Sequence, residues 1–280
     1  MNTPKQILSR TLQAFPASIL SSSGDENDTK EENSNNLADG NTIQQTHDFI
    51  VDNFGYLHKH VFLYESNSVI TGFNFQDPNV TELKTTSTRR TFTGYYLYNV
   101  EELYIEVGDR QPKSMIFAVP FCIKVSGRKI QLITNTFSRN IKAYVDEEIA
   151  PMRTVNSDKA ILSAFETSTR SVMLKLDINK AVKQLWEDDT IDARQVTFKE
   201  DWSEGVTRMD ENLLYKDKYP NRYLELLKMP LRKTTFKVLN NNYPINHFYA
   251  DPSMGTIQFP VYPDVEDHHE KFLNHLLSKN

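Results

Sequence analysis

The sequence predicts an α+β protein with an antiparallel β-rich N-terminal half, a mixed helical and β C-terminal half, and an N-terminal helical arm. Strand-like apolar segments fill residues 57–137, helical periodicity recurs over 157–166, 181–186 and 221–229, and strands recur before a C-terminal helix. Strands joined by short turns favour antiparallel pairing. The order of strands, then helices, then strands indicates α+β rather than a regularly alternating α/β fold.

The first predicted element is an amphipathic helical arm within residues 1–20. Thr3 and Gln6 fit a capping box, and Pro4 occupies the first helical position. The residues predicted to share its apolar face, and to form an interaction surface, are Ile7, Leu8, Leu12 and Phe15. A helix this short is marginal alone, so we expect the arm to dock on the protein's own body or on a neighbouring molecule. On this reading, deleting residues 1–20 leaves the body folded and weakens assembly.

Residues 21–41 are expected to form an acidic polar linker. Between Ser21 and Gly40 the chain has six Asp or Glu residues against one lysine, a sum of −5 that equals the net charge of the whole chain. The remainder is therefore electrically balanced. Because phosphate binding requires a positive field, nucleic acid and anionic membranes are not expected as main partners.

The body is predicted to consist of a helix plus a β-rich region, residues 42–150, and a mixed α/β region, residues 151–280, packed on it; the two regions could form one domain. A helix is expected over 42–54, with Asn41 and Gln44 as its cap. The strands expected after it cover 57–64, 69–75, 90–98, 103–107, 115–125 and 130–134. The last two should form a hairpin around Gly127.

The second region is expected to mix helices and strands. Its predicted helices cover 137–149, 157–166, 181–186, 221–229 and the segment from 264 to the C-terminus. Its predicted strands cover 171–178, 196–198, 234–239, 245–249 and 256–261.

Glycine and cysteine usage exclude several function classes. No two of the nine glycines lie closer than fourteen residues, so no glycine-rich phosphate loop and no nucleophile elbow is present in the sequence. The single cysteine, Cys122, lies in an apolar strand and reads as a small core residue in a protein of a reducing, cytoplasmic compartment. We expect no cofactor, no export signal and no membrane span.

Two groups of residues are alternative metal ligands. Asp77, Glu82 and Lys84 have the residue types with which magnesium nucleases hold a metal and a water. His268 and His269 lie in an acidic segment and could contribute imidazoles. The competing interpretations are a turn followed by a polar strand, and solvent-facing histidines at the start of a helix.

An alternative nucleic-acid site consists of Arg89 and Arg90 followed by Tyr96 and Tyr98. Aromatic side chains beside arginines can stack single-stranded bases. Aromatic residues are also favoured in strands for packing alone.

The leading functional prediction is a non-enzymatic structural or adaptor subunit of a large assembly. The 29 Phe and Tyr residues supply many anchors of the type enriched in protein interfaces. The expected partners are proteins in a homo- or hetero-oligomer, and incorporation into a virion, as a phage head, neck or tail component, is one setting. The alternatives are a metal-dependent nuclease or hydrolase and a nucleic-acid-binding accessory protein.

Overall fold

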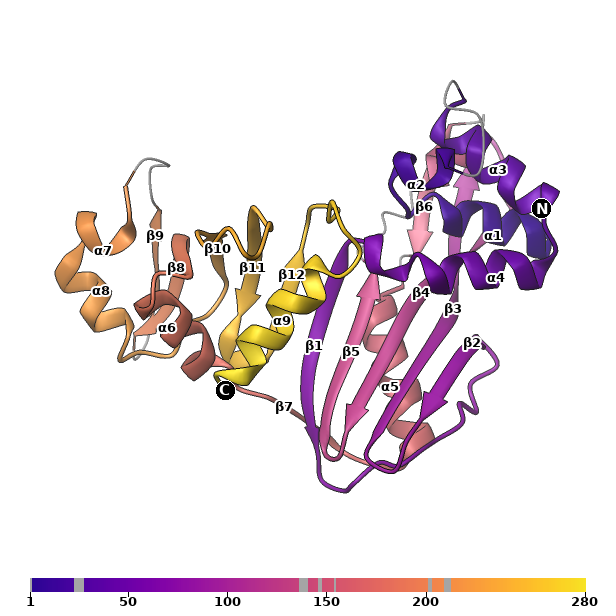
Figure 1. Ribbon diagram of the computed structural model, residues 1–280. Helices are drawn as coiled ribbons and strands as arrows, with labels where there is room; N and C mark the ends of the chain where they lie inside the picture. Colours follow the sequence, from indigo (N-terminus) through magenta and orange to yellow (C-terminus); the bar gives the residue numbers. More distant parts are fainter. Residues whose placement is uncertain are drawn as a thin grey trace.

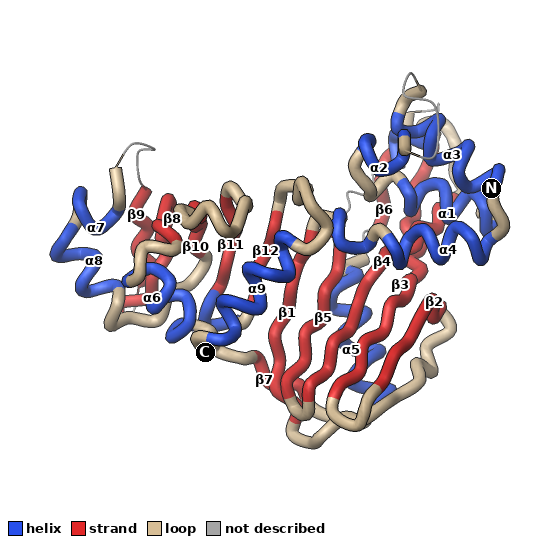
Figure 2. The backbone as a smooth tube through the Cα atoms, in the orientation of Figure 1, coloured by secondary structure: helices blue, strands red, loops and turns tan. Residues whose placement is uncertain are grey.

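The computed structural model describes residues 2–22, 28–135, 141–145, 148–153, 155–200, 203–208 and 213–280. Within this part the chain folds into nine α-helices and a large antiparallel sheet of twelve strands. The predicted α+β class is therefore confirmed. Figure 1 shows helices on both faces of the sheet, and Figure 2 shows the same arrangement by secondary structure.

The sheet runs through both predicted regions in the order β2-β3-β4-β5-β1-β12-β11-β10-β8-β9, with β6 paired to β3 and β7 to β1. The strands are β1 (Lys59–Ser66), β2 (Val80–Ser87), β3 (Thr91–Glu106), β4 (Lys113–Ser126), β5 (Lys129–Asn135), β6 (Ile149–Arg153), β7 (Met173–Lys175), β8 (Ile191–Glu200), β9 (Ser203–Arg208), β10 (Thr234–Val238), β11 (His247–Asp251) and β12 (Thr256–Phe259). The first strand pairs with the last, with Val61 opposite Ile257. This pairing makes the sheet continuous.

Helices cover the two faces of the sheet unequally. They are α1 (Pro4–Leu12), α2 (Ala17–Ser21), α3 (Lys30–Gly40), α4 (Ile43–Asp52), α5 (Ser157–Thr169), α6 (Asn179–Glu187), α7 (Tyr215–Lys218), α8 (Pro220–Leu226) and α9 (His268–Ser278). In Figure 1 the N-terminal helices and α9 lie in front of the sheet, and α5 lies behind it. None of the helices in the described ranges is long and apolar enough to cross a membrane.

The N-terminal arm docks on the chain's own sheet. The predicted capping box of Thr3 and Gln6 forms at the start of α1. Leu12 and Phe15 have no exposed surface, and the Thr11 hydroxyl donates to the carbonyl of Ala118 on β4 at 2.9 Å. Of the two docking places left open by the sequence, the structure therefore uses the body of the same chain.

The acidic segment differs from the expected polar linker because much of it is helical. Thr29 and Glu32 form a second capping box at the start of α3, and Leu37 and Ala38 are buried. α3 contacts α1 directly. A reciprocal cap and two adjacent apolar residues suffice to hold this polar sequence as a helix against a neighbour. Residues 23–27 lie outside the described ranges.

Other boundaries also differ from prediction. The cap of α4 is Thr42 with Gln45, one residue later than expected. The strands expected over 90–98 and 103–107 form the single strand β3, and 69–75 is not a strand. Instead its Phe73 and Phe75 pack against Phe165 of α5. Of the helix expected over 137–149, residues 137–140 and 146–147 lie outside the described ranges, and 141–144 is one 3₁₀ turn.

Candidate functional site

Asp77, Glu82 and Lys84, the first metal candidates, are not arranged around a common point. Asp77 lies in the turn before β2, where its carboxylate accepts the backbone N–H of Asn79 at 2.9 Å. Glu82 and Lys84 are exposed on the edge strand β2, with a bulge between them. Within the described ranges no group of three or more His, Cys, Asp or Glu is placed to hold a metal ion.

The two histidine candidates have different environments. His268 is partly exposed at the start of α9, whereas His269 is 3% exposed and stacks on Phe259 with ring centroids 4.4 Å apart. Burial, followed by the nearby charge of Lys59, lowers the pKa of His269 to about 3. His269 is therefore a neutral, packed imidazole at physiological pH.

The nucleic-acid candidates divide between surface and core. Arg89 and Arg90 are exposed in the β2–β3 turn. Tyr96 and Tyr98 are 1% and 8% exposed, and Tyr96 stacks on Phe121 with ring centroids 5.2 Å apart. Because their rings pack in the core behind the sheet, these two tyrosines do not form a surface on which bases could stack.

The apolar residues predicted as an interaction arm lie within the protein. Leu8, Leu12 and Phe15 are buried in the main hydrophobic core, and Ile7 packs partly buried against it. Phe15 meets Phe49 of α4 edge to face, with ring centroids 5.7 Å apart. In this fold the arm therefore presents its polar side outward.

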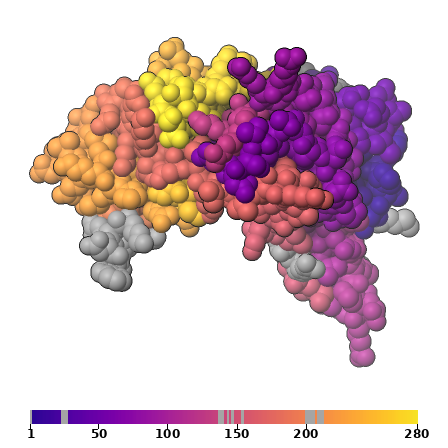
Figure 3. Space-filling model, turned by 90° about the horizontal axis from the view of Figure 1, so that it is seen from below, coloured from indigo at the N-terminus to yellow at the C-terminus, as the bar shows by residue number. Residues whose placement is uncertain are grey.

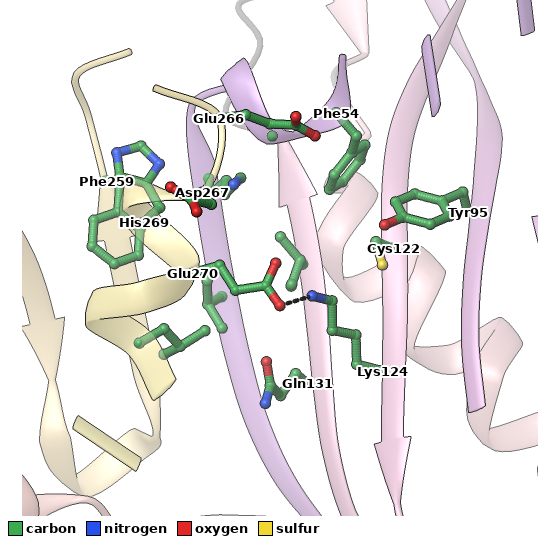
Figure 4. A pocket seen from close by; sticks show the side chains of 15 residues that line it. Phe54, Tyr95, Cys122, Lys124, Gln131, Phe259, Glu266, Asp267, His269 and Glu270 are labelled. Carbon is green, nitrogen blue, oxygen red and sulfur yellow. Dashed lines mark hydrogen bonds and ion pairs between the residues drawn. The ribbon is translucent and has the colours of Figure 1, made fainter. Parts of the chain in front are cut away.

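A cavity of about 220 Å³ lies between α9 and the front face of the sheet. Its wall joins segments distant in sequence, and Figure 4 shows the side chains from β3, β4, β5, β12 and α9 converging on it. Phe54 and Tyr95 form one aromatic wall, edge to face with centroids 5.3 Å apart. Phe259 and Leu273 contribute on the side of α9.

Lys59 is the unusual residue of this cavity. Along β1 the core-facing side chains are Lys59, Val61 and Leu63, which are 6%, 1% and 1% exposed. Within the described ranges Lys59 has neither an ion-pair partner nor a hydrogen-bonded side chain. Burial, opposed by the charge of Glu270, lowers its pKa to about 8.

A second lysine in the cavity has a partner. Lys124 of β4 forms an ion pair with Glu270 of α9, with Nζ 2.6 Å from Oε1, and Figure 4 shows this contact across the cavity. Another charged wall residue, Glu266, packs against Gly55, where an added Cβ would lie 1.9 Å from the Glu266 Cγ. Glycine at position 55 therefore allows the segment before α9 to close over the cavity.

Neither the thiol nor the phenol of this cavity is an activated nucleophile. Cys122 is fully buried, and burial raises the pKa of its thiol to about 12, so the thiolate is scarce at neutral pH. Burial also raises the pKa of the Tyr95 hydroxyl well above its usual range. Lys59 differs from both, because a lowered pKa is the shift that activates an amine.

Lys59 is not among the site residues predicted from the sequence, although the sequence contains a signal for it. A lysine at a core-facing position of a strand with apolar alternation is rare unless it is paired. The pattern around Lys59, Val61 and Leu63 contains that signal. The residues of β4 and α9 that face Lys59 across the cavity could not be predicted, because these elements meet β1 only in the tertiary structure.

A groove of about 600 Å³ lies on the back face of the sheet, next to α5. Its floor includes Phe62 of β1 and Tyr249 of β11, and Tyr249 is 41% exposed. Lys175 and Lys233 lie at its rim and are exposed. In Figure 3, which views the molecule from below, the outline steps inward beside α5.

No protein-family model matches this chain, and no curated protein sequence matches it.

Proposed function

We propose that the chain is a non-enzymatic structural or adaptor subunit of a protein assembly, in which copies associate head to tail. The observation that carries this proposal is the groove on the back of β12, β11 and β10. The front of these strands is covered by α6 and α9, whereas within the described ranges no helix covers their back. An aromatic floor with a polar rim is the usual composition of a protein-binding surface.

The groove has a positive rim. Lys175 and Lys233 are exposed there, and the carboxylate of Asp251 is partly buried among them, where burial raises its pKa. A partner surface that carries carboxylates would therefore be attracted to the rim.

The same chain carries such a surface on its N-terminal helices. Glu31 and Asp39 of α3 and Asp48 of α4 are exposed. Lys5 of α1 lies beside them and keeps its charge, with its ammonium donating to the backbone carbonyl of Asp39 at 2.7 Å. The acidic surface of α3 and α4 in one copy, the acidic helical layer, is thus complementary in charge to the groove rim of the next copy.

Contact between two different surfaces is heterologous, and repeated heterologous contacts produce rings or filaments. This is the type of contact from which ring-shaped and tubular assemblies are built. A virion component such as a phage head, neck or tail protein remains one setting for the proposal.

Charge reversal tests the proposed contact. Lys175→Glu with Lys233→Glu makes the groove rim acidic, and Glu31→Lys with Asp39→Lys makes the helical surface basic. We expect each double variant to remain monomeric alone, because its two surfaces then repel, and the two to associate when mixed. Lys180→Glu is the matched control, since Lys180 is exposed on α6 outside the groove.

The measurement is sedimentation velocity at low and high salt. Association of the wild type should weaken as salt rises, because exposed charges are screened. A wild type that stays monomeric at about 100 μM and low salt, roughly 50 mM, contradicts the proposal. Association of the groove variant equal to that of the wild type contradicts it as well.

A further inference from the structure

The cavity beneath α9 has an unsatisfied charge that the assembly proposal does not use. Lys59 is 6% exposed and lines the cavity, yet no described carboxylate pairs with it. Its neighbour Lys124 is already paired with Glu270. The charges of Glu270 and Glu266 act on Lys59 from within the same cavity without forming an ion pair with it. A buried ammonium without an ion-pair partner is unfavourable, and a bound anion would supply that partner.

We infer that this cavity binds a small organic carboxylate with an apolar body, and that the Lys59 ammonium pairs with its carboxylate group. The inference is independent of the head-to-tail contact, because the cavity lies on the front face of the sheet and the groove on the back.

The charge of the wall selects a singly charged ligand. One ammonium, that of Lys59, has no ion pair, whereas of the carboxylates in the same wall Glu270 is paired with Lys124 and Asp267 with Lys271. Among the described residues this leaves the carboxylate of Glu266 without an ion pair. A phosphate carries more negative charge than a carboxylate and would be repelled more strongly by Glu266. A single carboxylate matches the single available cation.

The remaining wall defines the body of the ligand. Phe54 and Tyr95 present aromatic surfaces, and Val61, Ile133 and Leu273 present aliphatic ones. Such a wall favours a flat apolar group next to the carboxylate, since pockets bind apolar bodies and orient them with few polar contacts. Benzoate has this composition and is small relative to the cavity.

The test compares benzoate with benzamide by isothermal titration calorimetry at pH 7. The two molecules have nearly the same shape, but only benzoate is charged. We expect benzoate to bind the wild type at least about tenfold more tightly than benzamide, the ratio that one charge-assisted pair provides. Lys59→Met should lose this preference, whereas Lys180→Met, on the surface of α6, should retain it.

Three results overturn the inference. They are no benzoate binding up to about 10 mM, equal affinity for benzoate and benzamide, and unchanged benzoate affinity in Lys59→Met. The first two require only the wild-type protein, so the test does not depend on the folding of a variant. Lys59→Met is expected to fold, because methionine fills a similar volume without a buried charge.

Discussion

At the scale of single residues, the charge of Lys59 affects the stability of the whole protein. The residue begins β1 and points to the core side of the sheet. Its side chain is 6% exposed and has no ion-pair partner in the described part of the chain. Burying this charge destabilises the folded protein relative to the unfolded chain, in which the lysine is hydrated.

This cost has a defined pH dependence. Folding lowers the pKa of Lys59 from 10.5 to about 8, so the unfolded chain binds more protons between these pH values. The stability contribution of the group therefore rises with pH across that window. The pKa difference corresponds to about 3 kcal/mol at most. The charged or titratable groups that line the cavity around it are Tyr95, Cys122, Lys124, Glu266, Asp267, His269 and Glu270.

We predict that Lys59→Met is more stable than the wild type at pH 7, by roughly 1 to 3 kcal/mol. The difference should shrink as the pH rises from 8 to 10, because the wild-type lysine then loses its charge in the folded state. Urea unfolding of both proteins at several pH values measures this.

Lys124→Met is the matched control for that prediction. It removes a lysine from the same cavity, but one that is paired with Glu270. We expect no gain in stability from this variant. If both variants are stabilised equally, the unpaired state of Lys59 is not the cause.

At the scale of elements, the N-terminal helix behaves as part of the core. Leu12 of α1 is fully buried, and Thr11 beside it bonds to β4. The sequence-based expectation that residues 1–20 could be deleted without unfolding the body therefore changes. Removing α1 would expose the apolar surface of β4 and of α4, so we now expect the truncated protein to be destabilised.

A pair of leucine substitutions makes this quantitative. Leu12→Ala should destabilise the protein by about 2 to 5 kcal/mol, because it creates a cavity in the core. Leu224→Ala, on α8, removes the same atoms from a side chain that is 55% exposed, and should cost under about 0.5 kcal/mol. Equal losses in chemical denaturation would show that α1 does not contribute to the core.

The capping boxes explain which helix boundaries were predictable. Thr3 with Gln6 was identified from spacing alone, and it forms. At α4 the neighbouring pairs Asn41 with Gln44 and Thr42 with Gln45 have the same spacing, and only the backbone geometry decides between them. The spacing of Thr29 and Glu32 also fits a capping box, and this cap forms at the start of α3. The polar composition of the segment led instead to the prediction of a linker.

At the scale of the whole molecule, the sheet separates two surfaces with different properties. Its front is covered by helices and encloses the cavity of Lys59, and its back leaves the groove of Tyr249 open beside α5. The acidic helical layer lies at the opposite end of the sheet from β9 and β10. Because of this separation, the acidic helices of one copy cannot bind the groove of the same copy, and contact between copies is favoured.

The head-to-tail geometry predicts how the mass of the assembly increases with protein concentration. A contact between unlike surfaces leaves one surface free on each end of a chain of copies, so addition continues until a ring closes. We expect the weight-average mass in light scattering to rise beyond that of a dimer as concentration increases. A plateau at two copies would indicate a symmetric contact instead.

The amino-acid sequence by itself determined the α+β class, the cap and apolar face of α1, the hairpin around Gly127 and most strands of the second region, because these follow from local periodicity and turn chemistry. The tertiary structure decided which strands pair across the chain, that the arm docks on its own sheet, and that Lys59 lies in a cavity. The physical reason is that the segments in contact are far apart in the sequence. The cavity joins β1, β4 and α9, and the groove joins β1, β7 and β11; no local pattern specifies that these segments meet, because their contact is fixed only when the whole sheet closes over its core.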